Sequence, residues 1–222
     1  MRPKAVLFDL DNTLADRSAA IRRVGETFWR AEPAAQARDT LKDAVGLFVE
    51  WDGNGRVLPK RLIFEAAEKR WGTLTRTPVE LEAWYAAEYP RSYRPDPRID
   101  TMLAALAQRN IPWGIVTNGP QFQWDKVRHL GLDKFTRSIV VSGTFGHRKP
   151  EPEIFLEGLR LVGLSDPAEC LFVGDSADHD IEGARRVGMA TAWVSLGKDW
   201  PSTLAPPDHV VGHASEITRL FD

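Results

Sequence analysis

Carboxylate side chains gather in two stretches of the sequence, each directly after a run of apolar residues. The first stretch is Asp9-Leu10-Asp11-Asn12-Thr13 and the second is Gly174-Asp175-Ser176-Ala177-Asp178-His179-Asp180. If the fold brings the two together, their negative charges repel one another unless a cation neutralises them. Oxygen ligands alone favour magnesium over zinc. The sequence therefore predicts a Mg²⁺ site, although an isolated Asp-x-Asp is more often a helix cap or a surface turn.

Two further polar stretches, Thr117-Asn118-Gly119 and Arg148-Lys149-Pro150, could complete such a site. Taken alone, the first would cap the end of a strand, and the lysine of the second would be a solvated surface lysine. Pro150 restricts the chain beside Lys149 and could hold this lysine in place. We expect the two stretches to join the acidic residues if all four lie at strand ends.

The elements that must position these stretches are short buried strands and the helices between them. Several short apolar runs end abruptly in polar residues, which is typical of strands buried on both faces. Strand and helix alternate throughout the second half, which predicts an α/β fold with a doubly wound, Rossmann-like parallel sheet. Ligands bind beyond the carboxyl ends of the strands in such a sheet, and the polar stretches lie there. The expected strands are residues 5–8, 113–116, 138–141, 170–173 and 190–194, with 210–211 as a last short one.

Amphipathic stretches between these strands predict helices. Asp96 followed by Pro97 is a strong helix start, and the apolar residues from Ile99 to Leu106 recur at helical spacing. The other expected helices cover residues 120–130, 153–162 and 180–187.

The segment of residues 15–93 breaks this alternation, because it has helical patterns and no convincing buried strand. We expect a helical domain inserted into an α/β core made of residues 1–14 and 94–222. Its large aromatic side chains, such as Trp84 and Tyr85, are expected to pack between helices rather than stack on a ligand. Arg17, just after the first acidic stretch, is expected to be a solvated surface residue.

The overall composition excludes some classes of partner. The 222 residues carry 29 basic and 31 acidic side chains, a formal charge of −2, which provides no broad positive field for nucleic acid. The apolar run near the start is too short for a signal peptide, and no run approaches the ~20 residues of a membrane span. The single cysteine, Cys170, fits a reducing compartment. These features predict a soluble cytoplasmic protein that binds neither nucleic acid nor a membrane.

The four polar stretches, in this order, resemble the motifs of the haloacid dehalogenase (HAD) superfamily. The family pattern is Asp-x-Asp-x-Thr, then Ser or Thr, then Lys, then a Gly-Asp loop with a further Asp, and each part has a counterpart here. The resemblance covers residues 1–14 and 94–222. The helical insertion is similar to the family's type 1 cap, which closes over the site and largely decides which substrate fits.

This resemblance implies specific roles for the acidic residues. Asp9 is the expected nucleophile, which forms an aspartyl-phosphate and binds magnesium through its other oxygen. Asp11 is the expected general acid and base, and its backbone carbonyl also binds the metal. Asp175 is expected to complete the protein's share of the magnesium shell, with Asp180 as the supporting acid and Asp178 as the alternative.

The same resemblance assigns three residues to the phosphate group. The Thr117 hydroxyl and the Asn118 backbone are expected to hold phosphate oxygens, and Lys149 to offset the negative charge gathered there. We therefore predict a magnesium-dependent phosphatase acting on a small phosphorylated metabolite, such as a nucleotide monophosphate, phosphoglycolate or a sugar phosphate.

Other activities of the same fold remain open at this point. A 2-haloacid dehalogenase needs neither a metal nor a second aspartate, so Asp11 favours the phosphatase. A phosphomutase would use the same phospho-aspartate, and a binding module without turnover would keep the fold alone. The sequence leaves the oligomeric state open.

Overall fold

The predicted strands form one parallel sheet in the computed structural model, which describes residues 3–55 and 59–221. The strands are β1 (Ala5–Phe8), β2 (Trp113–Thr117), β3 (Ile139–Val141), β4 (Cys170–Gly174), β5 (Ala190–Val194) and β6 (His209–Val211). Their order across the sheet is β3-β2-β1-β4-β5-β6. In the centre, Val6 of β1 pairs with Trp113 of β2 on one side and with Leu171 of β4 on the other.

All neighbouring strands are parallel, so their carboxyl ends lie at one edge of the sheet. Every residue of β1, β2, β3 and β4 is buried, as expected for strands with helices over both faces. The doubly wound α/β core predicted from the sequence is therefore confirmed.

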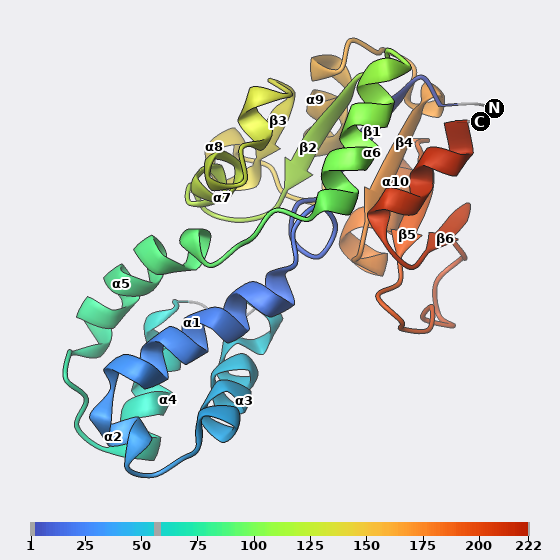
Figure 1. Ribbon diagram of the computed structural model, residues 1–222. Helices are drawn as coiled ribbons and strands as arrows, with labels where there is room; N and C mark the ends of the chain where they lie inside the picture. Colours follow the sequence, from blue (N-terminus) through green and yellow to red (C-terminus); the bar gives the residue numbers. More distant parts are fainter. Residues whose placement is uncertain (1–2, 56–58, 222) are drawn as a thin grey trace. The chain divides into compact units, whose positions relative to one another are not determined.

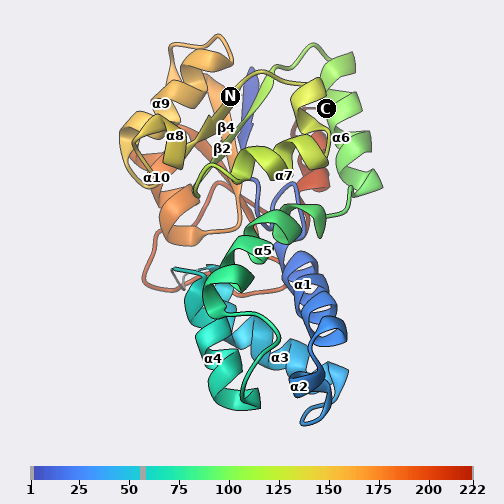
Figure 2. The same cartoon turned by 90° about the vertical axis from the view of Figure 1, so that its left-hand side faces the viewer.

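Helices cover both faces of this sheet (Figure 1). They are α6 (Pro97–Gln108), α7 (Gln123–His129), α8 (Ser142–Phe145), α9 (Pro152–Leu161) and α10 (Glu182–Arg186). The shorter helical turns are η2 (Leu132–Lys134), η3 (Pro167–Glu169), η4 (Ala177–Ile181) and η5 (Ala214–Phe221). Helices α9 and α10 pack together over one face, and α6 packs against η5 over the other (Figure 2). The side chain of Asp96 caps α6, at the start predicted from the sequence.

Two helices of this core differ from their prediction. Helix α7 is shorter than expected, because it begins at Gln123 rather than at Pro120. The helix expected over 180–187 is replaced by a wide π-type turn, η4, followed by α10. A hydrogen bond from the Ile181 N–H to the Ser176 carbonyl at 3.2 Å closes this turn. Such π turns recur at functional sites, and this one carries part of the second acidic stretch.

The segment that follows the first strand forms a second compact unit, Asp16–Arg94, distinct from the unit made of the residues up to Ala15 and from Pro95 onward. Its helices are α1 (Arg17–Ala31), α2 (Pro33–Gln36), α3 (Leu41–Asp52), α4 (Arg61–Trp71) and α5 (Pro78–Arg91), with a short turn, η1 (Gly53–Gly55). The described residues of this unit contain no strand. No helix in the described ranges is both long and apolar enough to span a membrane.

Aromatic side chains form the core of this helical unit. The ring of Phe28 lies 5.7 Å from that of Phe48, 5.6 Å from that of Phe64 and 5.9 Å from that of Trp71. Trp84 also packs against Phe28, with 6.0 Å between the rings. Because these rings come from four different helices, they hold the unit together, and the predicted packing of Trp84 between helices is confirmed.

A buried ion cluster adds to this unit. Arg17 forms an ion pair with Asp52, and the Nζ of Lys60 lies 2.8 Å from Oδ1 of the same aspartate. All three residues are buried, so the expectation that Arg17 is a solvated surface residue is wrong. Burial works to raise the pKa of Asp52, but the charges of Arg17 and Lys60 outweigh it and hold that pKa below its usual range.

Candidate active site

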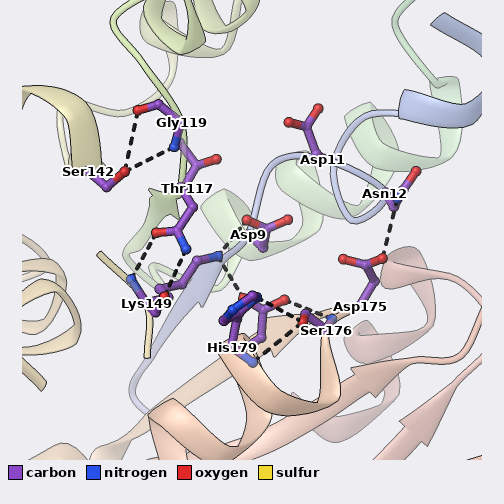
Figure 3. A network of polar contacts seen from close by, with 12 residues as sticks. Asp9, Asp11, Asn12, Thr117, Gly119, Ser142, Lys149, Asp175, Ser176 and His179 are labelled. Atoms are coloured by element: carbon purple, nitrogen blue, oxygen red, sulfur yellow. Dashed lines mark hydrogen bonds and ion pairs between the residues drawn. The ribbon is translucent and has the colours of Figure 1, made fainter. Parts of the chain in front are cut away.

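Strand ends and one loop bring polar side chains together at the carboxyl edge of the sheet (Figure 3). Asp9 directly follows β1, Thr117 ends β2, and Asp175 directly follows β4, while Lys149 lies in the loop before α9. Strand β1 lies between β2 and β4, so the connections run in opposite directions on its two sides. Ligands bind at such switch points in doubly wound sheets.

The ammonium group of Lys149 lies between two carboxylates. Its Nζ is 2.6 Å from Oδ1 of Asp9 and 2.6 Å from Oδ1 of Asp180. All three residues are buried, with exposed fractions of 7% for Asp9, 2% for Lys149 and 1% for Asp180. Burial works to lower the pKa of Lys149, but the charges of Asp180 and Asp9 outweigh it and raise that pKa above its usual range. Lys149 is therefore a buried cation at neutral pH, not a solvated surface lysine.

Asp9, Asp175 and Asp180 form a compact group of carboxylates, with one oxygen of each lying within 4.8 Å of the others. Burial raises the pKa of Asp9 well above its ordinary value, against the opposing charge of Lys149. Burial, together with the charge of Asp180, raises the pKa of Asp175 to about 6. With all three carboxylates ionised, this group together with the Lys149 ammonium would carry a net charge of −2. A divalent cation would balance that charge, and the oxygen-only donor set fits Mg²⁺.

The structure separates the two candidate acids of the second acidic stretch. The Ser176 backbone N–H donates to Oδ2 of Asp180 at 3.0 Å, which turns this side chain inward. Asp178 instead accepts a hydrogen bond from the Ser176 hydroxyl at 2.6 Å, and its side chain is 63% exposed. A Cβ at Gly174 would lie 2.5 Å from Cγ of Asp180, so this position needs glycine. Asp180, rather than Asp178, lies with the other carboxylates.

Asn118 connects the loop of Lys149 to the end of β2. Its side-chain Nδ2 donates to the Lys149 carbonyl at 2.9 Å, and the Lys149 N–H donates to its Oδ1 at 2.8 Å. The next residue, Gly119, donates its N–H to the hydroxyl of Ser142 at 3.0 Å. The Asn118 side chain therefore positions the backbone of Lys149, a contact that its place in the sequence did not predict.

The Asp11 carboxylate does not lie in the group formed by the other three. It points away from Asp9 (Figure 3). The Nζ of Lys126 lies 2.9 and 2.7 Å from its two oxygens, and the Nε2 of Gln123 lies 3.2 Å from Oδ2. Sequence reasoning missed both partners. The available signal was their spacing, because Gln123, Lys126 and the buried Val127 fall on one face of α7.

With this geometry established, comparison with known proteins gives the family. A model of the haloacid dehalogenase-like hydrolases matches residues 3–188. The chain belongs to this family. A curated relative, the glyceraldehyde 3-phosphate phosphatase of Methanopyrus kandleri, is 31% identical over 205 residues, which cover 88% of this chain and 85% of the relative. The N-acetylmuramic acid 6-phosphate phosphatase of Pseudomonas aeruginosa is 30% identical, over 100% of this chain and 96% of the relative.

A solved structure supports the fold of this haloacid dehalogenase-like hydrolase. The HAD-hydrolase YfnB from Bacillus subtilis, in a form bound to magnesium, has a TM-score of 0.76 and covers 100% of both chains. At 22% sequence identity, this likeness shows a shared fold.

Two further residues of this haloacid dehalogenase-like hydrolase hold Asp175. The Nδ2 of Asn12 donates to Oδ2 of Asp175 at 3.3 Å, and the Nε1 of Trp193 donates to its carbonyl at 2.9 Å. Asn12 has a φ of 62°, in the left-handed region that asparagine tolerates better than most residues. The Asn12 contact connects the two acidic stretches. No motif in the sequence marks Trp193, in β5 (Ala190–Val194), for its contact with Asp175.

A second group of metal-type ligands, His147, Glu151 and Glu153, is exposed. The Nδ1 of His147 lies 3.0 Å from a Glu151 oxygen and 3.7 Å from a Glu153 oxygen. Exposed acidic groups of this kind commonly occur without an ion. Among the described residues, the buried group of Asp9, Asp175 and Asp180 is the better metal-site candidate.

Proposed function

We propose that this hydrolase is a magnesium-dependent phosphatase that cleaves a small-molecule phosphate monoester through an aspartyl-phosphate formed on Asp9. The observation that carries the proposal is the contact of 2.6 Å between Oδ1 of Asp9 and the buried ammonium group of Lys149, beside Asp175 and Asp180. A carboxylate held next to a fixed positive charge is suited to this attack. The same charge offsets the negative charge on the phosphoryl oxygens in the transition state.

The donor set supports Mg²⁺ as the cofactor. Asp9, Asp175 and Asp180 would hold the ion with one carboxylate oxygen each, and the backbone carbonyl of Asp11 would complete the protein ligands. When bound, Mg²⁺ would supply further positive charge to the phosphoryl oxygens. With the carboxylates ionised, the net charge of −2 on this group and Lys149 would favour a divalent ion at this place.

In the first step, an oxygen of Asp9 attacks phosphorus, and the bond between phosphorus and the ester oxygen breaks. Asp11 donates a proton to the leaving oxygen, while the Thr117 hydroxyl, the Asn118 N–H and the Lys149 ammonium hold phosphoryl oxygens. In the second step, Asp11 takes a proton from water as the water oxygen attacks phosphorus. The bond between phosphorus and Asp9 then breaks, and inorganic phosphate leaves.

The size of the rate acceleration requires contributions from all of these groups. Hydrolysis of a phosphate monoester can demand an acceleration of up to ~10²¹-fold, whereas positioned acid–base catalysis supplies roughly 10² to 10⁴. Asp11 therefore provides only part of the rate. Covalent capture by Asp9, in-line positioning and the charge of Lys149 must provide much of the rest.

We propose that the helical unit Asp16–Arg94 acts as the cap that selects the ester. The two curated relatives are named for different substrates, although each is about as similar to this chain as the other. A shared core with different leaving groups is expected when the core performs the reaction and another part of the chain recognises the substrate. A panel of nucleotide monophosphates, phosphoglycolate and sugar phosphates would identify the ester.

An assay with a generic aryl phosphate tests the proposed reaction. We expect phosphate release in the presence of Mg²⁺, no release with EDTA, and no release by the Asp9→Asn variant. A phosphoenzyme, trapped by acid quench with radiolabelled substrate, should form in the wild type and not in Asp9→Asn. Asp178→Asn is the matched control, because this exposed carboxylate lies outside the group and its loss should leave activity unchanged. Phosphate release by Asp9→Asn at the wild-type rate would exclude the mechanism.

A further inference from the structure

Helix α7 holds the carboxylate of Asp11 through two side chains. Both oxygens of Asp11 lie within hydrogen-bond distance of the Lys126 ammonium group, at 2.9 and 2.7 Å. Gln123 adds a contact of 3.2 Å to Oδ2. Lys126 and Gln123 are each only 1% exposed. Burying an ammonium group is costly unless a carboxylate accompanies it, so this pair is a specific contact of the fold.

Gln123 connects the acid–base residue to the proposed phosphate site. The same Nε2 that faces Asp11 lies 2.7 Å from the hydroxyl oxygen of Thr117 and 3.1 Å from the carbonyl of Asn118. The Asp11 carboxylate and the Asn118 carbonyl can only accept, which fixes the orientation of the amide, and the Thr117 oxygen accepts from the same nitrogen. Because the Thr117 oxygen accepts this bond, its own O–H proton remains available to donate to a phosphoryl oxygen. One helix therefore contacts both the proton-transfer group and the phosphate-holding group.

The backbone alone does not fix the Asp11 carboxylate. A hydrogen bond of 2.7 Å from the Asn12 N–H to the Ala15 carbonyl closes the loop that carries Asp11, so the main chain is held. The side chain is 21% exposed and can rotate about two bonds. A misplacement of about 1 Å can cost 10²-fold in rate, so the contacts that restrict this rotation matter for catalysis.

We infer that Lys126 and Gln123 are positioning residues, which fix the Asp11 carboxylate relative to Thr117 and so set the geometry of the proton-transfer steps. The inference rests on the proposed phosphatase mechanism, in which Asp11 transfers protons and Thr117 holds phosphate. Without Lys126, the Asp11 carboxylate remains present and hydrated, but it spends less time in the orientation that Lys126 and Gln123 hold. The attack by Asp9 on an ester with a good leaving group needs little proton transfer and should be almost unaffected.

Rapid kinetics with p-nitrophenyl phosphate separate these two effects. The burst of nitrophenolate reports formation of the aspartyl-phosphate, and the steady state reports its hydrolysis, in which Asp11 activates water. We expect Lys126→Met to leave the burst rate within about threefold of the wild type and to slow the steady state by about 10- to 100-fold. Lys126→Arg should restore part of the steady-state rate, because it keeps a buried cation beside Asp11. The exposed Lys134→Met is the matched control and should change neither phase.

Two further measurements distinguish positioning from a structural role. In the Asp11→Asn background, Lys126→Met should change the steady-state rate by less than twofold, because the group that it positions is absent. Mg²⁺ affinity should also be unchanged by Lys126→Met. If Lys126→Met does not fold, Lys126→Gln replaces it in the same comparison.

Some outcomes would overturn this inference. A Lys126→Met defect that is equal in both phases, or that persists in full in the Asp11→Asn background, would show that Lys126 supports the fold instead. If Asp9→Asn is inactive, such results still agree with the proposed phosphatase mechanism and contradict only the role of Lys126. A wild-type protein that releases no phosphate overturns the proposed function, and this inference with it.

Discussion

Lys149 and Asp180 face each other at the carboxyl edge of the sheet, with 2.6 Å between Nζ and Oδ1 and with both side chains only 2% exposed. The same ammonium group contacts Asp9, so one cation holds the proposed nucleophile and a proposed metal ligand. Asn118 fixes the backbone of Lys149 from the other side. Activity and metal binding should therefore both depend on this lysine.

Replacing Lys149 with methionine should lower kcat by about 10²- to 10³-fold. The variant loses the positive charge that offsets the negative charge on the phosphoryl oxygens. It also loses the charge that lowers the pKa of Asp9, so a smaller fraction of this nucleophile is ionised at neutral pH. Steady-state phosphate release measures the effect, with exposed Lys134→Met as the control. A variant that keeps more than a tenth of the wild-type kcat would contradict this role.

Asp175→Asn should weaken Mg²⁺ binding by at least tenfold, because one anionic ligand is lost. Isothermal titration with Mg²⁺ measures the affinity, and Asp178→Asn is the control. Burial, with the charge of Asp180, raises the pKa of Asp175 to about 6. Above that pH, ionised Asp175 destabilises the metal-free fold, and an uncharged Asn does not.

The metal-free Asp175→Asn variant should therefore unfold at a higher temperature than the metal-free wild type at pH 7.5. The order should reverse at high Mg²⁺ concentration, because the tighter-binding wild type is stabilised more by the ion than the variant is. Equal Mg²⁺ affinity in the two proteins would exclude Asp175 as a ligand.

Gly174→Ala should weaken Mg²⁺ binding without removing any ligand. A Cβ at this position would lie 2.5 Å from Cγ and 2.6 Å from Cβ of Asp180, so the carboxylate has to move. We expect a loss of about tenfold or more in Mg²⁺ affinity and a fall in kcat, both measured as above. Gly46→Ala is the control, because the added Cβ there would meet no atom within 4 Å beyond its chain neighbours and the backbone of its own helix. Unchanged metal affinity in Gly174→Ala would place Asp180 outside the metal shell.

Asp52→Asn should lower the free energy of unfolding by about 3–5 kcal/mol at pH 7, because it leaves Arg17 and Lys60 buried without their partner. The pKa of Asp52 is lower in the folded than in the unfolded protein. Its stabilising contribution is therefore present above the ordinary pKa of ~3.9 and is lost as the pH falls through the folded value.

Urea unfolding between pH 3 and pH 7 measures this contribution. The difference between wild type and Asp52→Asn should stay constant near neutral pH and shrink below about pH 4. Glu65→Gln is the control, because its exposed pair with Arg61 should contribute about 0–1 kcal/mol. If the difference in free energy of unfolding between the two proteins increased as the pH fell, the stabilising role assigned to Asp52 would be contradicted.

Much of the core was predictable because its signals are local. Strand β5 has the predicted bounds, Ala190–Val194, since an apolar run between polar neighbours marks both of its ends. The placement of Asp9, Thr117 and Asp175 at one edge followed from the parallel sheet, in which all carboxyl ends meet. The π-type turn η4 was not predictable, because its sequence also fits an ordinary helix.

The sequence by itself determined the strands, their parallel arrangement and the chemical types of the residues at the strand ends. Only the tertiary structure decided that Asp180 lies with the other carboxylates, that Lys126 binds Asp11 and that Arg17 is buried against Asp52. These last two contacts join residues 115 and 35 positions apart. Periodicity and turn signals describe neighbours along the chain, whereas the partner of a buried charge depends on which helix faces pack together.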